Sequence, residues 1–284
     1  MELSEEVKIG MMGALTSQEG TGPRVDHKDL EIELPESFDA RLHWPQCKVI
    51  SEIRDQSSCG SCWAISTVEA ITDRNCIHSN GKIQVDLSTA DVMDCLDAGC
   101  QGGHPFHAWS YWHKKGIVTG GNFTSKSGCQ PYPFPNCEHH VNSTHYPPCK
   151  KEIYPTPPCV KKCQPSYPKS YQQDKHYGKQ PYRVDGSEEA IQKEIMTNGP
   201  VTAAFVVFAD FLVYKHGVYQ HKAGRLLAGH AVKMIGWGVE EGTKYWLIAN
   251  SWNRDWGDKG LVKFLRGVNE VDIESRVSAG LPKF

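Results

Sequence analysis

The residues best suited to chemistry in this chain lie in the segment Gln56-Ser57-Ser58-Cys59-Gly60-Ser61-Cys62-Trp63-Ala64. After Cys62 the chain runs to Asn80 without Gly or Pro, and its apolar residues recur at helical spacing, so we predict a helix that begins at Cys62. The N-terminal end of a helix carries partial positive charge, which favours the thiolate form of a cysteine. Because a thiolate attacks carbonyl carbons, Cys62 is a candidate nucleophile, with the side-chain amide of Gln56 close upstream.

Cys59 and Cys62 on their own fit two other kinds of site. Their Cys-x-x-Cys spacing is found in thioredoxin-like redox pairs and in halves of zinc sites. A redox pair follows a strand, whereas the residues before Cys59 are polar and turn-like. A zinc site needs a second tight pair, and Cys159 and Cys163 have no histidine at ligand spacing after them. A peptidase is the leading hypothesis, and a disulfide oxidoreductase, which requires a free Cys59, is a distant alternative.

The composition describes a soluble globular protein. The chain has 284 residues, of which 39% are hydrophobic and 23% charged, enough for one large domain or two small ones that share a core. A formal net charge of −2 argues against nucleic acid or an anionic membrane as the main partner. No apolar run approaches the length that spans a bilayer.

Eleven cysteines are too many for an ordinary reduced cytosolic enzyme, and the odd number leaves one thiol free. Two sequons, at Asn122 and Asn142, fit the same secretory or endolysosomal route and are expected glycosylation sites. We therefore expect a lysosomal or secreted, extracellular protein. The acidic N-terminus shows no signal peptide, so we expect that the true N-terminus is missing from this sequence.

Helical signals precede strand signals along the chain. Ser88 is placed to cap a helix, Pro105 to start one that ends before Gly116, and a further helix follows Ser187 and stops at Asn198-Gly199-Pro200. Four β-rich stretches follow, with a turn at 241–243 between the second and the third: 201–208, 230–239, 244–250 and 260–265. A site is expected in a cleft between a helical half and a sheet half.

A cysteine nucleophile needs a base and a third group that orients the base. His230 and Asn250 each lie at the edge of a predicted strand, where a hairpin could bring them side by side. Cys62 would attack the peptide carbonyl, and His230 would later protonate the leaving amine. A catalytically silent binding glycoprotein would be a different class, but the intact Gln56, Cys62, His230 and Asn250 argue against it.

The contexts of these four residues resemble the papain family of cysteine peptidases. The resemblance implies an α+β, papain-like two-lobed fold, with a helical left lobe, a β-barrel-like right lobe and the active site in the cleft between them. It also implies that Gln56 and the backbone N–H of Cys62 form an oxyanion hole, that Asn250 orients His230, and that Trp252 shields their hydrogen bond. The family usually has Gly where Ser57 stands.

His230 lies 168 residues after Cys62 (230 − 62), more than the roughly 130–150 of papain-type enzymes, so extra chain must lie between them. The insertion at about 137–149, with its histidine pair, resembles the occluding loop of the cathepsin B group. There His139 and His140 would receive the C-terminal carboxylate of a substrate, so that dipeptide removal accompanies internal cleavage. Adjacent histidines point apart in most backbones and no third ligand is evident, so we expect no metal and no cofactor.

The same resemblance assigns further residues. The implied disulfides are Cys47–Cys76, Cys59–Cys100, Cys95–Cys159, Cys129–Cys163 and Cys137–Cys149, which leave Cys62 free. The implied substrate-binding residues, besides the loop histidines, are Gly102, Gly103, His104, Pro105, Ala204, Gly229, Ala231, Trp252 and Arg276. His104, Pro105, Ala204 and Ala231 would line the S2 pocket, and Arg276 would replace at its floor the glutamate of mammalian cathepsin B. We expect aliphatic or aromatic P2 residues, with some tolerance of acidic ones.

The resemblance covers residues 34–284, and it suggests that residues 1–33 are the C-terminal remnant of a propeptide. Those residues show no clear core pattern, and the region of Gly13 would lie across the cleft, with cleavage expected near Leu34. The expected partners are protein and peptide substrates, cystatin-like inhibitors and the propeptide itself, with no nucleic acid or membrane, and the protein is expected to be a monomer. The loop would be held by His139 on Asp55 and, if it reaches, His145 on Asp255.

Overall fold

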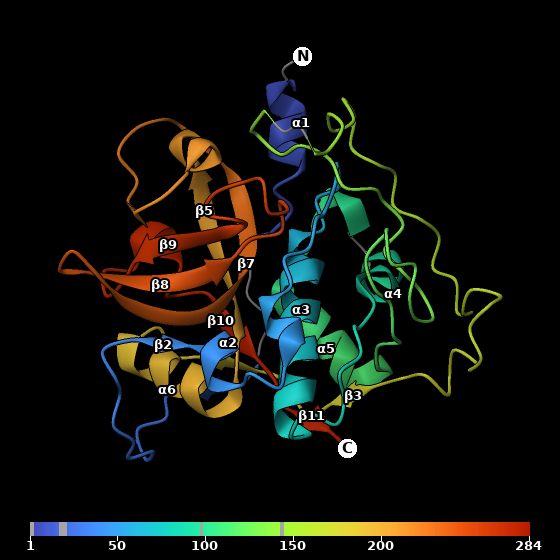
Figure 1. The fold of residues 1–284 in the computed structure, drawn as a ribbon, viewed down its shortest axis with the longest axis horizontal. Coiled ribbons are helices and arrows are strands. Elements are labelled where there is room, and N and C mark those ends of the chain that lie inside the picture. Colours follow the sequence, from blue (N-terminus) through green and yellow to red (C-terminus); the bar gives the residue numbers. More distant parts are fainter. Residues whose placement is uncertain (1–2, 17–21, 97–98, 143–144) are drawn as a thin grey trace.

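A buried helix, α3 (Cys62–His78), lies between a helical side and a sheet side of the molecule (Figure 1). The structure is a computed structural model and describes residues 3–16, 22–96, 99–142 and 145–284. Every residue of α3 from Cys62 to Ile77 is buried, because Trp63 and its neighbours pack into the helical core while Ile77 packs into the sheet core. The predicted helix after Cys62 is confirmed.

The helical side contains α4 (Thr89–Cys95) and α5 (Pro105–Lys115). The Ser88 hydroxyl accepts a hydrogen bond from the backbone N–H of Asp91 at 3.0 Å, which caps α4 as predicted. Pro105 opens α5, and Gly116, with a φ of 70°, ends it. The predicted start of the first helix and both predicted ends of the second are therefore confirmed, because they depend on local capping.

The sheet side is one nine-stranded sheet. Its path is β1-β4-β10-β5-β7-β8-β9-β6, and β2 pairs with β7 off this path. β7 and β8 form the predicted hairpin through the turn at Glu241 and Gly242. The path has two ends, β1 and β6, so the expected barrel-like lobe is an open sheet in the part of the chain that the structure describes. Its strands are β1 (Arg24–Val25), β2 (Phe38–Asp39), β4 (Tyr182–Val184), β5 (Val201–Phe208), β6 (Val218–Tyr219), β7 (Leu226–Glu240), β8 (Thr243–Ala249), β9 (Leu261–Leu265) and β10 (Val277–Ala279).

Shorter elements complete the fold. α6 (Glu188–Asn198) packs against β7, and it is capped by Ser187 and ends before Gly199, as predicted. β3 (Tyr177–Gly178) and β11 (Pro282–Lys283) form a separate two-stranded sheet. The remaining short helices are α2 (Ala40–His43), η1 (Lys48–Ser51), η2 (Gly99–Gln101), η3 (Ala209–Val213) and η4 (Glu270–Asp272).

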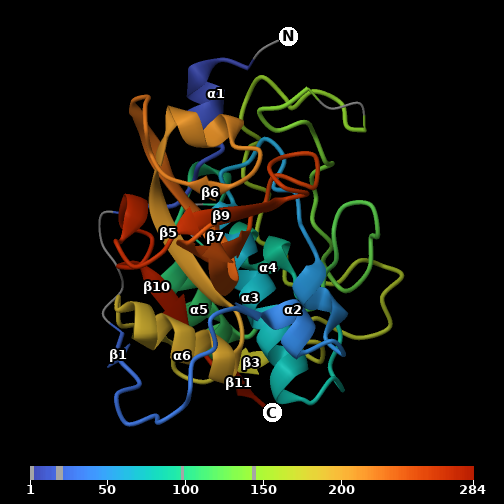
Figure 2. The same ribbon diagram turned by 60° about the vertical axis from the view of Figure 1, so that its left-hand side comes forward.

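We call residues 1–33 the leader, and its described part contains regular elements that the sequence did not predict. The leader begins with α1 (Glu5–Gly10), capped by the Ser4 hydroxyl, and Met11 and Ala14 are buried. Its later described part contains β1, which pairs with β4 far from α1 (Figure 2). The expectation of no core pattern was wrong because the apolar residues pack against the rest of the chain, not against one another.

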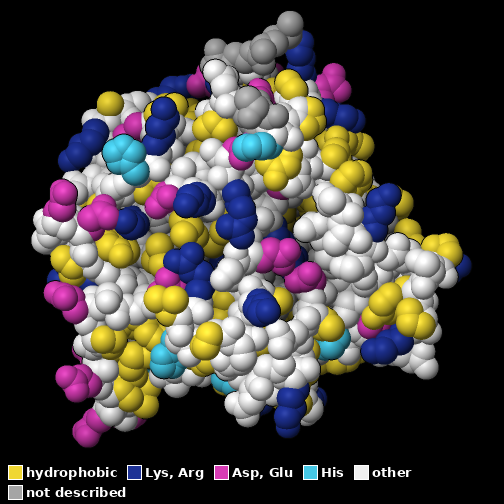
Figure 3. Space-filling view, viewed as in Figure 1, with side chains coloured by type: hydrophobic (Ala, Val, Ile, Leu, Met, Phe, Trp, Pro, Cys, Tyr) yellow, Lys and Arg dark blue, Asp and Glu magenta, His cyan; other side chains and the backbone are white. Residues whose placement is uncertain are grey.

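All five implied disulfides are present, and the one cysteine outside them is the buried Cys62. Cys59 is therefore not available for a redox pair. No helix within the described ranges is long and apolar enough to cross a membrane. Acidic and basic side chains are interspersed over the face shown in Figure 3, as the small net charge suggests.

Candidate active site

Cys62 is the first residue of α3 and is fully buried beneath the leader. Its Sγ accepts a hydrogen bond from the backbone N–H of Gly13 at 3.2 Å. Burial raises the pKa of the Cys62 thiol to about 11, although the backbone N–H groups of Ala231, Gly13 and others lower it. Burial beneath the leader thus opposes the helix dipole, which favours the thiolate, while the leader is in place.

His230 and Asn250 come together across the β7–β8 hairpin. The Nε2 of His230 bonds the Oδ1 of Asn250 at 2.8 Å, and the indole of Trp252 lies beside the imidazole with ring centroids 4.8 Å apart. Burial lowers the pKa of His230 to about 4, an effect that the bond to Asn250 partly offsets and the nearby His139 increases. The structure thus holds a neutral imidazole whose Nδ1 has no hydrogen-bond partner among the described residues.

Gln56 is held in one orientation by its neighbours. The hydroxyl of Ser251 donates to the Gln56 Oε1 at 2.7 Å, so the side-chain NH₂ faces the opposite way. That NH₂ donates to the carbonyls of Cys59, at 2.8 Å, and of the leader residue Met11. The Met11 carbonyl therefore occupies a donor that the sequence assigned to a substrate oxyanion.

The leader passes along the predicted substrate-binding backbone. Gly103 donates to the carbonyl of Gly13 at 2.7 Å and accepts from the N–H of Leu15 at 2.9 Å. The N–H of Ala14 donates to the carbonyl of Gly229 at 3.1 Å. Gly102, with a φ of 107°, approaches the same stretch so closely that a Cβ would lie 2.8 Å from the Gly13 oxygen. An extended peptide is thus already seated beside Cys62.

A small cavity of about 30 Å³ lies next to Ala204, which packs on Cys62. Leu15 and Thr16 of the leader line it, and so do the predicted residues His104, Pro105 and Arg276. Ala231 is not among the residues that line this cavity; it belongs to a buried cluster with Cys62, Ala14 and Ala204. The cavity is also lined by Phe106, Arg183, Val277 and Ser278.

The segment from Cys137 to Cys149 closes one end of the leader's path. His139 is fully buried, and its Nε2 donates to the Asp55 Oδ1 at 2.6 Å. Asn253 adds a contact that the sequence did not predict, because its Nδ2 donates both to Asp55, at 2.9 Å, and to the carbonyl of Cys137, at 2.7 Å.

At the tip of the same segment, His145 does reach Asp255. Its Nδ1 lies 3.0 and 3.1 Å from the two carboxylate oxygens, and the histidine side chain is 73% exposed. His140 instead lines a cavity of about 540 Å³ together with the leader residues Leu3, Glu5 and Lys8. Both ring nitrogens of His140 are buried without a hydrogen-bond partner, and burial lowers its pKa to about 3.

One group of side chains in the described part of the chain has metal-ligand spacing: Cys137, His139 and Cys149. Both sulfurs belong to one disulfide, so neither can supply a thiolate. The donor set therefore does not fit a metal.

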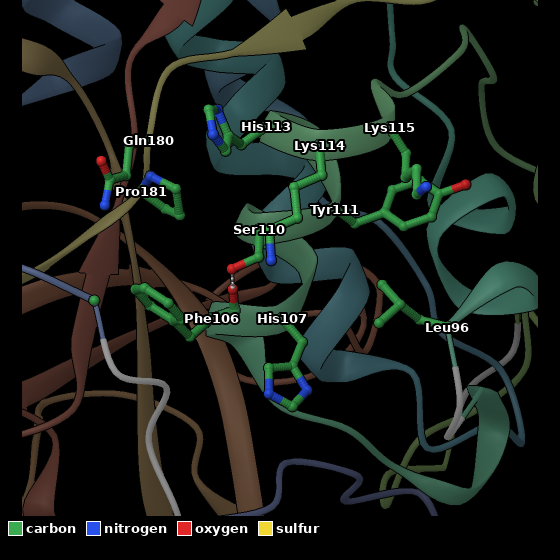
Figure 4. Close-up of a pocket in the computed structure, with 11 residues that line it drawn as sticks. Leu96, Phe106, His107, Ser110, Tyr111, His113, Lys114, Lys115, Gln180 and Pro181 are labelled. Atoms are coloured by element: carbon green, nitrogen blue, oxygen red, sulfur yellow. Dashed lines mark hydrogen bonds between the residues drawn. The ribbon is translucent and has the colours of Figure 1, made fainter.

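A third hollow, of about 510 Å³, lies on the outer face of α5 (Figure 4). His107, Ser110, Tyr111 and Lys114 of that helix line it, and Pro181 lies opposite them. None of the predicted site residues lines this hollow, so it is separate from the cleft.

Sequence reasoning missed Ser251, Asn253 and Arg183. The first two lie in the run that follows Asn250, where their side-chain chemistry was visible but their partners were not. Arg183 carried no signal, because only the pairing of β4 with β10 brings it to the cavity.

Comparisons with known proteins agree with this geometry. Residues 34–281 match the family model described as papain family cysteine protease. A cathepsin B-like cysteine proteinase of Schistosoma japonicum is 56% identical over 92% of this chain and 77% of its own length. A cathepsin B-like cysteine proteinase of Caenorhabditis elegans is 52% identical over 99% of this chain and 76% of its own.

Solved structures show the same fold. Procathepsin B from Trypanosoma congolense superposes with a TM-score of 0.85 at 38% identity, covering 100% of this chain and 90% of its own. A digestive procathepsin L from Tenebrio molitor shares the fold, with a TM-score of 0.69. It is 23% identical and covers 98% of this chain and 79% of its own. The chain therefore belongs to the papain family of cysteine proteases and is of the cathepsin B type.

Proposed function

We propose that this protein hydrolyses peptide bonds through Cys62 and His230, both internally and by removing C-terminal dipeptides, and that the leader blocks it until cleaved near Leu34. The observation that carries the proposal is the seated leader: its backbone bonds Gly103 and Gly229 and brings Gly13 to the Sγ of Cys62. A groove that binds extended backbone next to a buried thiol suits a peptide substrate. The family model matches from residue 34 onwards, which supports a boundary between the leader and the peptidase domain near Leu34.

Removal of the leader would expose Cys62 to water. It would also remove the hydrogen bond that the backbone N–H of Gly13 donates to the Cys62 sulfur. The thiol could then transfer its proton to the Nδ1 of His230, whose other nitrogen is fixed on Asn250. The thiolate attacks the peptide carbonyl, and His230 protonates the leaving amine. Gln56 would donate to the oxyanion once the Met11 carbonyl has left, together with the backbone N–H of Cys62.

The direction of the leader explains how it could block the site without being cut. Its N-terminal helix α1 lies at the end closed by the Cys137–Cys149 segment, and Leu15 lies at the opposite side of Cys62. A substrate whose C-terminal carboxylate reached that segment would run the other way. The leader also presents an N–H group, not a carbonyl carbon, to the sulfur.

Dipeptide removal is proposed from the histidines of the same segment. The ring nitrogens of His140 lack partners in a cavity that the leader now shares, and such buried donors suit a carboxylate. His139 is anchored on Asp55 and holds the segment across the cleft. A substrate carboxylate beside His140 would end two residues beyond the scissile bond.

We also infer the location, the inhibitors and the glycosylation of the enzyme. Five disulfides suit a lysosomal or secreted location, with cystatin-like proteins as inhibitors of a monomeric enzyme. Asn122 is partly exposed and Asn142 is exposed, so both could carry glycans, although Ser143 and Thr144 of the second sequon lie outside the described residues.

The test is a paired assay after the leader has been removed from the 284-residue chain by limited proteolysis. An internally quenched peptide with a blocked C-terminus reports internal cleavage, and a peptide with a free C-terminus reports release of dipeptides by mass spectrometry. Both products are expected. Absence of dipeptide release with intact internal cleavage would remove the exopeptidase assignment alone.

A further inference from the structure

The cavity beside Ala204 has two arginine side chains in its wall. Arg276 lies just before β10 and Arg183 lies in β4, and both line the cavity. No acidic residue is among the described residues that line it. A pocket of this composition attracts negative charge.

The sheet register explains why these two arginines line one cavity. Arg183 is directly opposite Ser278 in the antiparallel pair of β4 and β10. Arg276 precedes Ser278 by two residues, and side chains two apart on a strand lie on the same face. Arg183 and Arg276 are therefore diagonal cross-strand neighbours.

The pocket lies within reach of a substrate seated at Cys62. Ala204 packs both on Cys62 and in the pocket wall, and the backbone N–H of Ala204 bonds the carbonyl of Arg276 at 3.1 Å. Leu15 and Thr16 of the leader now line the pocket, so leader removal opens it to the substrate side chain.

The charge of Arg276 is only partly balanced. Its Nη2 lies 3.1 Å from the Oδ2 of Asp272, whose side chain is 45% exposed, while its Nη1 is buried without a hydrogen-bond partner. A buried unpaired donor of this kind is costly and favours a ligand that supplies an acceptor. A planar guanidinium binds a carboxylate with two parallel hydrogen bonds.

We propose that Arg183 and Arg276 together make this pocket select an acidic P2 side chain, with Arg183 as a specificity-determining residue. The proposal rests on the proposed peptidase function and goes beyond the tolerance of acidic residues expected from Arg276 alone. We define the selectivity as the preference for glutamate over glutamine at P2. The two side chains have the same shape, so the comparison isolates the effect of the charge. Valine remains a substrate because Pro105 and Val277 supply apolar surface.

The test compares dipeptide-coumarin substrates that differ only at P2, carrying glutamate, glutamine, valine or arginine before a common P1 arginine. The 284-residue chain is used after proteolytic removal of its leader, at about pH 6, where a P2 glutamate is ionised. We expect kcat/KM for glutamate to exceed that for glutamine by about 10- to 100-fold, the range of a hydrogen bond that gains a full charge. The ratio should fall as NaCl is raised, and arginine should be the poorest P2 residue.

Arg183→Gln and Arg276→Gln should each lower the glutamate-to-glutamine ratio, and the double variant should bring it close to one. Arg225→Gln is the matched control, because Arg225 is exposed, does not line the pocket and forms an ion pair with the leader residue Glu5. A ratio near one in the unchanged enzyme, with valine cleaved normally, would overturn this proposal and leave the peptidase function standing. Failure to cleave any of the four peptides would overturn the function itself.

Discussion

The backbone N–H of the leader residue Gly13 donates to the Sγ of Cys62 at 3.2 Å. The approach depends on the absence of a side chain, since a Cβ on Gly13 would lie 1.7 Å from the carbonyl oxygen of Gly60. Burial beneath the leader raises the pKa of the Cys62 thiol, whereas this hydrogen bond from Gly13 lowers it. The leader thus excludes water from the candidate nucleophile and also occupies a position on its sulfur.

Gly13→Val is expected to loosen the leader and raise the activity of the uncleaved chain several-fold. The valine cannot fit against Gly60, so the leader must shift off Cys62. The measurement is initial-rate peptide cleavage by the intact chain, with the leader confirmed present by mass spectrometry. Asp29→Ala, at an exposed leader position, is the control. After leader removal the unchanged protein and the two variants are identical in sequence from residue 34, so they must cleave the peptide at the same rate. Unchanged activity of the intact Gly13→Val variant would show that the Gly13 contact is not what keeps the intact chain inactive.

Ser251 is predicted to act by orienting Gln56. Its hydroxyl bonds the Gln56 Oε1, and its backbone N–H bonds the Oδ1 of Asn250 at 2.9 Å. Ser251→Ala keeps the backbone bond and removes the hydroxyl, so kcat should fall about tenfold with little change in KM, less than the roughly 10²–10³ of losing an oxyanion donor outright.

A double-mutant cycle distinguishes orientation from general disruption. In a Gln56→Ala background, Ser251→Ala should have almost no further effect on kcat, because the group that it positions is gone. Equal losses in both backgrounds would mean that Ser251 acts independently of Gln56.

The segment Cys137–Cys149 should control the balance of the two activities. His139→Ala leaves the carboxylate of Asp55 buried with one partner fewer, so it should release the segment and raise internal cleavage at acid pH. His145→Ala should have a smaller effect, because the exposed ion pair with Asp255 contributes roughly 0–1 kcal/mol. The ratio of dipeptide release to internal cleavage gives the comparison directly.

The same ratio should change with pH. Both attachments pair a histidine with a carboxylate, and a pair of this kind is strongest where the imidazole is charged. Dipeptide removal should dominate at acid pH and internal cleavage should rise towards neutrality, although the pH-independent bonds of Asn253 keep the base of the segment in place. A flat ratio across pH, in the unchanged protein and in His139→Ala alike, would rule out these histidines as the attachment.

Glu69 is predicted to weaken the fold at neutral pH. Neither carboxylate oxygen of this buried residue has a hydrogen-bond partner. Burial raises its pKa to about 7, an effect that Lys233 and Arg54 oppose and Asp73 and Glu52 increase. The folded state therefore holds a proton that the unfolded state loses near pH 4.5, and stability falls as pH rises from there to about 7, by on the order of 3 kcal/mol.

Glu69→Gln replaces the carboxyl group with an amide that does not titrate. The substitution should therefore raise the melting temperature at pH 7.5 and change it little at pH 5. Glu194→Gln is the matched comparison. Burial alone would raise the pKa of Glu194, but Arg74 and its hydrogen-bond partners lower it to about 2. That substitution should therefore destabilise at both pH values. Equal melting temperatures for the unchanged protein and Glu69→Gln at pH 7.5 would mean that water reaches Glu69.

Local patterns in the sequence were enough to predict much of the fold. The start of α3 at Cys62, the cap at Ser88 and the turn at Glu241–Gly242 depend on residues next to one another in the chain. Contacts made by distant segments were not predictable from such patterns. Arg183 reaches the cleft only through strand pairing, and the protonation state of Cys62 depends on a leader that showed no periodicity.

The most direct test of the central claim is to react the protein with a mechanism-based epoxide and map the label by mass spectrometry, alongside the variant Cys62→Ser. After leader removal we expect one label per molecule on Cys62 and loss of peptidase activity in step with labelling. Cys62→Ser should be unlabelled and inactive, with all five disulfides intact. Peptide turnover by Cys62→Ser, a label on another residue, or a disulfide found at Cys62 would contradict the assignment of Cys62 as the nucleophile.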